Sequence, residues 1–291
     1  PLVGNGLEGS HHNGVTNCYF KNIPYDVGNG REDIRVWGSG KFDEKTTDGA
    51  YFTIQGNLFD HADGEGTEII SLKSNFNQVI NNTVVATLGG INIRRGSNNV
   101  LKGNVVLGEG LAGAHGLRMS GPNHTVQGNY VSGCDYGIRI SAGEFVVEIG
   151  SDYKKHWPEE QLVLMPSDCD IANNRFIKPA GGVAIEAATL DPKISLVGPK
   201  NIPNRFKGNV VIGGKVKLPA AEGGSSLGTL PQGWSEKKEL VGFKPLTPKD
   251  VGPAWVIALR EADDFPMEDD MSCSRNLETA KAAKKKKTKT K

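Results

Sequence analysis

The sequence is poor in the residues and patterns that indicate a helical bundle, a membrane protein or a cysteine-based site. It has only 4 Met and 4 Trp in 291 residues, and no hydrophobic run approaches the roughly 18 residues that a membrane-spanning helix needs. The 4 Cys are far apart and form no CxxC pair, which excludes a zinc ribbon and a thioredoxin-like site. With 37% hydrophobic residues and a mean hydropathy of −0.37, the chain is expected to be soluble, with no membrane partner.

The chain also lacks a strong excess of positive charge when its last eleven residues are left out. Seven Lys and no acidic residue fall in the last eleven positions, from Lys281 to Lys291. Without these seven Lys the chain has 27 basic and 33 acidic residues, so its net charge is −6 instead of +1. A basic tail on an acidic body is typical of a disordered terminus, and we expect no nucleic-acid partner.

Glycine is abundant instead, with 38 residues, and Asn recurs beside small β-branched residues, which favours short strands and tight turns. One short phrase that contains Asn returns seven times. From Asn57 the steps between these Asn residues are 25, 22, 25, 45 and 35 residues, and the step from Asn17 is 40, so the repeating unit is 20–25 residues. The copies are Thr16-Asn17-Cys18-Tyr19-Phe20, Gly56-Asn57-Leu58-Phe59, Asn81-Asn82-Thr83-Val84, Gly103-Asn104-Val105-Val106, Gly128-Asn129-Tyr130-Val131, Asn173-Asn174-Arg175-Phe176 and Gly208-Asn209-Val210-Val211.

This repeat predicts an all-β fold, a right-handed parallel β-helix with three short strands in each coil. Between the Asn phrases lie short alternating runs such as Tyr136-Gly137-Ile138-Arg139-Ile140, which are typical of strands with one apolar face. A leucine-rich repeat would need Leu at fixed offsets, and a propeller would need units about twice as long. We expect the Asn residues to form a structural ladder at a corner of the coil, where the amide bonds its equivalent one coil along and the backbone tolerates the left-handed conformation.

The chain is predicted to contain a single β-helix domain over residues 1–222. Residues 223–262 are rich in Pro and aperiodic, and we interpret them as an irregular segment packed on the helix, against its last coils. We expect residues 263–291 to form a charged, disordered, Lys-rich tail. An insertion around 144–166, with Tyr153, Lys154, Lys155, His156 and Trp157, is either a loop that binds an anionic sugar chain or an ordinary anchored loop.

The densest group of polar residues lies in the stretch from Asp60 to Ser74. Asp63, Glu65 and Glu68 place three carboxylates within six residues, which suits an oxygen-ligand site for a hard cation such as Ca²⁺, although a solvated acidic turn would have the same composition. In a coil of about twenty-one residues, Lys73 and Arg94 would lie side by side on adjacent coils. Two neighbouring cations repel, so either water screens them or an anion belongs between them.

The same stretches resemble the β-helical polysaccharide lyases that include chondroitinase B and related alginate lyases. The resemblance covers about residues 5–255 and rests on the order and spacing of its motifs. These are His11-His12-Asn13, Asn29-Gly30-Arg31-Glu32-Asp33-Ile34-Arg35, Glu68-Ile69-Ile70-Ser71-Leu72-Lys73-Ser74, Asn92-Ile93-Arg94-Arg95-Gly96, His115-Gly116-Leu117-Arg118-Met119 and Val251-Gly252-Pro253.

The resemblance implies a β-elimination on a polysaccharide that contains uronic acid. Lys73 would be the base that removes the C5 proton, and Arg94 would bind near the leaving oxygen and assist its departure. Asn29, Glu65 and Glu68 would bind a Ca²⁺ that neutralises the substrate carboxylate.

By the same resemblance, Arg95, His115 and Arg118 would bind the substrate. Arg95 departs from the family, which commonly has His after the Arg, and could therefore favour a more anionic partner. Glu65 and Glu68 also depart from it, because the two acidic ligands are usually separated by one residue. Either Gly66-Thr67 makes a bulge, or the metal pair is Asp63 and Glu65, or metal binding is lost.

Alginate, and poly-mannuronate in particular, is the expected anionic substrate, because no sulfate-binding cluster is evident beyond Arg95; dermatan sulfate is the other candidate. We expect a secreted or periplasmic protein, although the sequence from Pro1 onward contains no signal segment, and we expect a monomer. Two other functions compete. One is a non-catalytic β-helix that binds a polysaccharide or a protein, and the other is a pectin-type glycosidase, which would need converging carboxylates where this chain has Lys and Arg.

Overall fold

The computed structural model describes most of the chain between residues 11 and 261. The predicted insertion, apart from its last four residues, the predicted tail and Asn29 lie outside the described residues. The described ranges are 3–4, 11–28, 30–39, 47–141, 163–187, 202–218 and 243–261, of which 3, 4 and 261 are described by their backbone alone.

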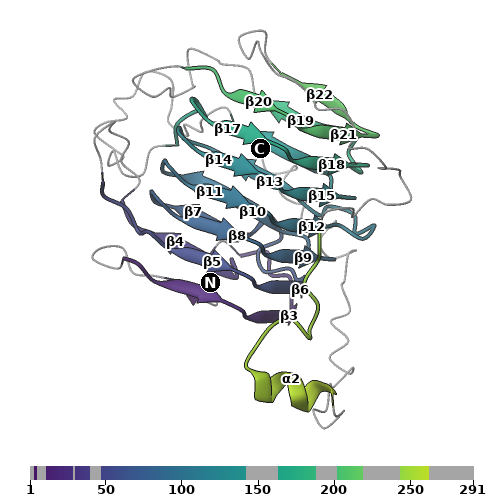
Figure 1. Cartoon of the computed structure of the whole chain (residues 1–291). Coiled ribbons are helices and arrows are strands. Elements are labelled where there is room, and N and C mark those ends of the chain that lie inside the picture. Colours follow the sequence, from purple (N-terminus) through teal and green to yellow (C-terminus); the bar gives the residue numbers. More distant parts are fainter. Residues whose placement is uncertain are drawn as a thin grey trace.

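Three parallel sheets run the length of the molecule, one of eight strands and two of seven (Figure 1). Sheet A contains β1 (Val3–Gly4), β4 (Ile34–Trp37), β7 (Glu68–Lys73), β10 (Gly90–Arg95), β13 (Leu117–Met119), β16 (Tyr136–Ile140), β19 (Val183–Ala187) and β22 (Lys215–Lys217). Sheet B contains β2 (Gly14–Thr16), β5 (Thr53–Gln55), β8 (Gln78–Ile80), β11 (Val100–Lys102), β14 (Thr125–Gln127), β17 (Asp170–Ala172) and β20 (Arg205–Lys207). Sheet C contains β3 (Tyr19–Ile23), β6 (Leu58–Ala62), β9 (Thr83–Val85), β12 (Val105–Leu107), β15 (Tyr130–Ser132), β18 (Arg175–Ile177) and β21 (Val210–Ile212).

Successive strands belong to sheets A, B and C in turn, so each coil contributes one strand to each sheet. Every strand pairs in parallel with the equivalent strand of each neighbouring coil, and the strands of the two end coils have one such neighbour. This is the right-handed parallel β-helix that the repeat predicts, and the solved structures described below share it. Within the described residues, no helix has the length and hydrophobicity of a membrane-spanning segment.

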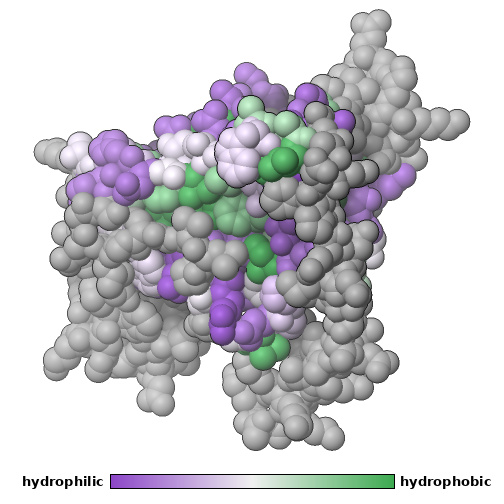
Figure 2. Space-filling view, turned by 90° about the horizontal axis from the view of Figure 1, so that it is seen from below, coloured by the Kyte–Doolittle hydropathy of each residue, from purple (hydrophilic) through white to green (hydrophobic). Residues whose placement is uncertain are grey.

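The core is a stack of aliphatic side chains that point into the coil from equivalent positions. In sheet A the inward position of six successive strands is Ile or Leu, and all six side chains are fully buried. These residues are Ile34, Ile70, Ile91, Leu117, Ile138 and Ile185. In the view onto the end of the solenoid where β3 lies, hydrophobic side chains gather near the centre of the described surface, with hydrophilic ones around them (Figure 2).

The predicted Asn ladder is present at the corner between sheets B and C. Each side-chain amide donates to the amide oxygen of the next Asn at 2.9 to 3.0 Å, and that oxygen also accepts the backbone N–H of the same donor residue. Because all of these groups are buried, the ladder satisfies polar atoms that would otherwise destabilise the core. Its members are Asn57, Asn82, Asn104, Asn129, Asn174 and Asn209.

Two details of the ladder prediction were wrong. The left-handed conformation belongs to the residue before each ladder Asn, for example Gly56 with φ of 65° and Asn81 with φ of 53°. Bonding along the stack and left-handed geometry are therefore divided between neighbouring residues. The register also aligns Asn17 with Gly56, so Cys18, whose backbone N–H donates to Asn57 at 2.9 Å, stands at the ladder position of the first coil.

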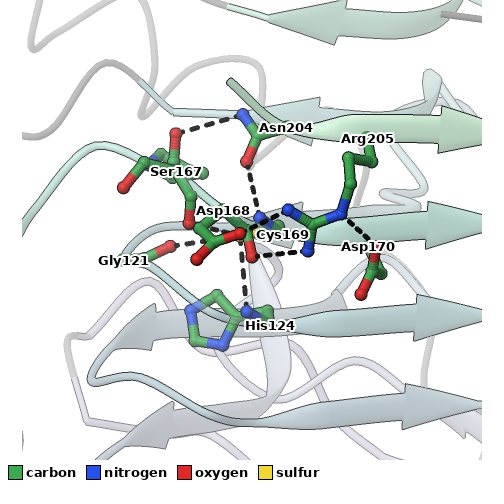
Figure 3. A network of polar contacts seen from close by, with 9 residues as sticks. Gly121, His124, Ser167, Asp168, Cys169, Asp170, Asn204 and Arg205 are labelled. Carbon is green, nitrogen blue, oxygen red and sulfur yellow. Dashed lines mark hydrogen bonds and ion pairs between the residues drawn. The ribbon is translucent and has the colours of Figure 1, made fainter. Parts of the chain in front are cut away.

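A second buried ladder lies at the corner between sheets A and B and was not predicted. It begins with Asn77 and Asn99. It continues through His124 and Cys169 to Asn204, the part that Figure 3 shows. The Nδ1 atom of His124 accepts the backbone N–H of Asn99 at 3.1 Å, so the proton of the neutral ring is on Nε2. Burial lowers the pKa of His124 to about 4. The ladder thus uses His and Cys in place of Asn, and periodicity of one residue type could not reveal it.

Residues 243–261, here called the C-terminal strap, return along sheet C toward the first coil (Figure 1). They end in helix α2 (Ala254–Glu261), which lies beside β3. Val251 in the strap is fully buried. The strap touches progressively earlier coils: Phe243 packs on Tyr130, Leu246 bonds Thr83, Gly252 bonds Asn17, and Arg260 lies over Tyr19.

Candidate active site

The outer face of sheet A carries the candidate residues at β4, β7 and β10. Side chains alternate along a strand, so the inward Ile70 and Leu72 of β7 leave Ser71 and Lys73 on the outer face. Lys73 is nevertheless only 8% exposed. The charged groups around it are therefore partly removed from water, which strengthens their interactions.

Lys73 is held by a fully buried carboxylate. Its Nζ atom donates to Glu32 Oε1 at 2.8 Å, and Arg35 Nη1 lies 3.5 Å from Glu32 Oε2. Burial favours the neutral acid, but the hydrogen bond from Lys73 and the charges of Lys73 and Arg35 outweigh it, so the pKa of Glu32 lies below its ordinary value. The Glu32 carboxylate is therefore ionised at neutral pH.

Three carboxylates converge beside this pair. Glu32, Glu65 and Glu68 each offer an oxygen, and these oxygens lie within 4.8 Å of one another. Burial, together with the nearby charge of Glu65, raises the pKa of Glu68, although Lys73, Ser71 and Arg94 act against the shift. Close carboxylates that repel in this way become more stable when a cation lies between them.

The local structure shows which of the acidic side chains lie close together. Asp63 accepts the backbone N–H of Leu88 at 3.0 Å and is not part of the converging group. A turn closed by the bond from the Gly66 N–H to the Asp63 carbonyl, at 2.8 Å, places Glu65 before β7. Glu65 therefore approaches Glu68 through this turn, and the pairing of β7 with β10 also shifts register between Glu68 and Ile70. The Glu65 carboxylate also accepts the Gly30 N–H at 3.0 Å.

The register corrects the expected pairing of Lys73. A bulge between Ile93 and Arg95 makes Arg95, and not Arg94, the partner of Lys73 across the sheet. Arg94 is the extra residue of the bulge, and its charge opposes the upward shift of the pKa of Glu68 that burial causes. A strict alternation, read from the sequence, could not show which of the two Arg residues the bulge displaces.

His115 and Arg118 lie along the same face, toward the next coils. The register pairs Arg118 with Asn92 of β10, and its Nε donates to Ser141 at 3.0 Å. His115 Nδ1 lies 3.2 Å from the Thr67 carbonyl oxygen, and its ring is 5.3 Å from that of Tyr136. Both side chains therefore lie on the side of the three carboxylates that faces the later coils of the solenoid.

Two residues of the site were not singled out from the sequence. Glu32 stands in the stretch from which only Asn29 was chosen, and its position two residues before Ile34 is the one signal that could have identified it. Trp37 lies at the end of β4, with its ring beside three cationic side chains. Both residues precede Lys73 by more than thirty positions, and only the coil brings them to it.

The chain is similar to known proteins in sequence and in structure. A family model described as Chondroitinase B matches residues 2–178. The chain resembles the structure of a PL6 family polysaccharide lyase from Pseudopedobacter saltans, with 33% identity and a TM-score of 0.67 over 87% of this chain and 66% of that protein. No curated protein shows significant similarity to the chain.

Two further solved structures share the fold at lower identity. A mannuronic acid specific polysaccharide family 6 lyase from human gut microbiota has 22% identity and a TM-score of 0.59, over 90% of this chain and 62% of that one. A PL6 alginate lyase in complex with a trisaccharide has 18% identity and a TM-score of 0.56, over 84% and 62%. The chain thus spans less than two thirds of the length of these three structures.

Proposed function

Because this chain belongs to the chondroitinase B family, we propose that it is a polysaccharide lyase that cleaves a uronic-acid polymer by β-elimination. The observation that supports this most is the position of Lys73 beside three converging carboxylates, on a face that continues with Arg and His side chains. A hydrolase would place its carboxylates around the scissile bond with no need for a Lys at their centre.

Elimination requires a base at C5 and departure of the oxygen at C4. The neutral amine of Lys73 takes the C5 proton, the C–H electron pair forms the C4–C5 double bond, and the C4–O bond breaks. The leaving oxygen takes its electron pair and gains a proton from a water molecule, and the hydroxide that remains is neutralised by the proton that Lys73 has taken. Since Lys73 donates to Glu32 in the resting structure, it must first give up a proton to act as the base. Arg94, next to Glu68, binds near the leaving oxygen.

Glu32, Glu65 and Glu68 would hold the Ca²⁺ that the family implies, with Asn29 as a further oxygen ligand. Oxygen ligands lie about 2.3–2.6 Å from Ca²⁺, so ligands on one ion can be up to about 5 Å apart. The 4.8 Å limit on the three carboxylate oxygens is compatible with that span. A bound Ca²⁺ would neutralise the uronate carboxylate and stabilise the negative charge that develops during proton removal.

The substrate we propose is alginate, with poly-mannuronate preferred over dermatan sulfate. One of the structures that share the fold is described as mannuronic acid specific, and another as an alginate lyase with a trisaccharide. Arg95, His115 and Arg118 would hold the uronates around the cleaved bond. A polymer of this kind is met outside the cytoplasm, so we further propose a secreted or periplasmic location.

The test is a panel of uronans, namely poly-mannuronate, poly-guluronate, dermatan sulfate and polygalacturonate. Elimination creates a conjugated double bond, so ultraviolet absorbance should rise with poly-mannuronate at the highest rate. Reducing ends that form without a rise in absorbance would identify a hydrolase instead. Binding without cleavage of any polymer would identify a non-catalytic β-helix and would contradict the proposal.

The metal is tested on the same protein without substrate as well as with it. Calorimetric titration with Ca²⁺ should show one site, and Glu68→Gln should weaken binding by about tenfold or more because a charged ligand is lost. A chelator should suppress turnover, and excess Ca²⁺ should restore it. Full activity in the chelator, with no heat of Ca²⁺ binding, would remove these carboxylates from the metal role.

A further inference from the structure

Trp37 is surrounded by cations on the outer face of sheet A. Its ring centroid lies 4.9 Å from Lys73 Nζ, 5.1 Å from Arg95 Cζ and 5.5 Å from Arg35 Cζ. A positive charge within about 6 Å of an indole centroid is attracted by the negative face of the ring. Three cations at one ring are far more than an incidental surface contact.

The register explains how this arrangement arises. Trp37 pairs with Lys73 across β4 and β7, and Lys73 pairs with Arg95 across β7 and β10. The three residues therefore form one row across adjacent strands, on the same face of the sheet. Arg35 joins them because it lies two residues before Trp37 and so faces the same side.

The row contains a repulsion that something must offset. Lys73 and Arg95 are like charges at directly opposed positions, an arrangement that is destabilising in a sheet. Glu32 binds Lys73, but it also contacts Arg35 and belongs to the group proposed to bind a metal. Glu32 therefore interacts with other groups besides Lys73, whereas the contact between Lys73 and the Trp37 ring does not depend on a bound ligand.

We propose that Trp37 is a positioning residue, whose ring fixes the Lys73 amine and the Arg95 guanidinium where substrate meets them. This inference rests on the proposed lyase function for its effect on turnover, but the contact itself can be measured without it. A misplacement of about 1 Å at a reacting group can reduce a rate on the order of a hundredfold. The consequence should therefore appear in kcat, because Lys73 acts in the chemical step.

The first experiment compares Trp37→Leu and Trp37→Phe with the unchanged protein, with poly-mannuronate as substrate. Trp37→Leu should lower kcat roughly tenfold and raise KM by less than about threefold, whereas Trp37→Phe, which keeps a ring, should recover most of the loss. Trp255→Leu is the matched control, because Trp255 is 66% exposed and belongs to α2, far along the chain from the three cations around Trp37. A Trp37→Leu protein with unchanged kcat, or a Phe variant as slow as the Leu variant, would overturn the proposal.

A second measurement preserves the shape of the side chain, so it does not depend on the Leu variant folding. Replacing Trp by fluorinated Trp weakens the negative face of the ring in steps. Turnover should fall with each added fluorine, and the fall should vanish in a Trp37→Phe background, which keeps the other 3 Trp. A fall of the same size in both backgrounds would contradict a role for Trp37.

A third measurement separates failure of this inference from failure of the proposed function. The ring current of Trp37 should shift the proton resonances of the Lys73 ε-methylene upfield, and Lys73→Arg identifies those resonances by removing them. In Trp37→Leu they should return to the ordinary Lys position. If no uronan is cut but the upfield shift is present, the lyase proposal fails and the contact stands. If turnover occurs without the shift, the positioning role fails.

Discussion

At the scale of single residues, the charge of Lys73 is tied to a carboxylate that water does not reach. Glu32 is fully buried, and removing its partner would leave it with Arg35 at 3.5 Å. Breaking a buried pair of this kind costs on the order of 3 to 5 kcal/mol, so truncation of Lys73 would change stability together with activity. A substitution that keeps the positive charge separates the two effects.

Lys73→Arg is therefore the sharper test of the base. The guanidinium can still pair with Glu32, but it stays protonated and cannot accept the C5 proton. We expect turnover to fall by at least about a hundredfold, the usual contribution of a general base, with a melting temperature within a few degrees of the unchanged protein. Lys102→Arg, at an exposed position of β11, is the matched control and should keep full activity. An active Lys73→Arg enzyme would exclude Lys73 as the base.

The sequence could identify the types of residue in the site but not all of their contacts. Lys73, Glu65 and Glu68 are close together in the chain, and their proximity in space follows from local geometry. The contact between Glu32 and Lys73 joins residues 41 positions apart. Its existence depends on the length of the coil between them, which no local pattern specifies. The bulge that contains Arg94 could not be predicted either, because a regular alternation of inward and outward side chains does not indicate where a strand has an extra residue.

At the scale of elements, the corner between sheets B and C combines two different requirements. One residue adopts the left-handed conformation, as Asn81 does, and the next supplies a buried amide to the stack, as Asn82 does. Repeated Asn predicts the ladder because the same amide can bond its own kind indefinitely. It does not predict the register at Cys18, or a ladder that His124 and Cys169 continue, because bonding there depends on geometry rather than on residue type.

The two positions of one corner should respond differently to substitution. Asn82→Ala removes the acceptor for Asn57 and the donor to the Ile54 carbonyl, which are buried groups with no water to replace it. We expect a loss of about 2 to 4 kcal/mol in the free energy of unfolding, measured by urea denaturation. Asn81→Gly is the control, because Gly occupies this position at Gly56 and should change stability by less than about 1 kcal/mol. Equal losses would mean that the ladder contributes nothing specific.

At the scale of the whole molecule, a solenoid differs from a globular domain because each coil contacts only its neighbours. Stability is then local, and an end coil opens more easily than the middle ones. The C-terminal strap departs from this scheme, since it joins the first coil at Asn17 and Tyr19 to later coils at Thr83 and Tyr130. The expectation that this segment packs against the last coils was wrong for residues 246–260, which reach the first coil through contacts that no repeat encodes.

Val251→Ala should therefore loosen the first coil in particular. The side chain is fully buried, and the next residue, Gly252, exchanges hydrogen bonds with Asn17. We expect a loss of about 1 to 2 kcal/mol from the removed methyl groups and the space they leave. Hydrogen exchange should become faster in β2 and β3 but not in β20 and β21, because coils transmit strain only to their neighbours. Val27→Ala, at a position 64% exposed, should change neither quantity. Faster exchange of equal size in all four strands would show that the strap stabilises the solenoid as one cooperative unit rather than clamping its first coil.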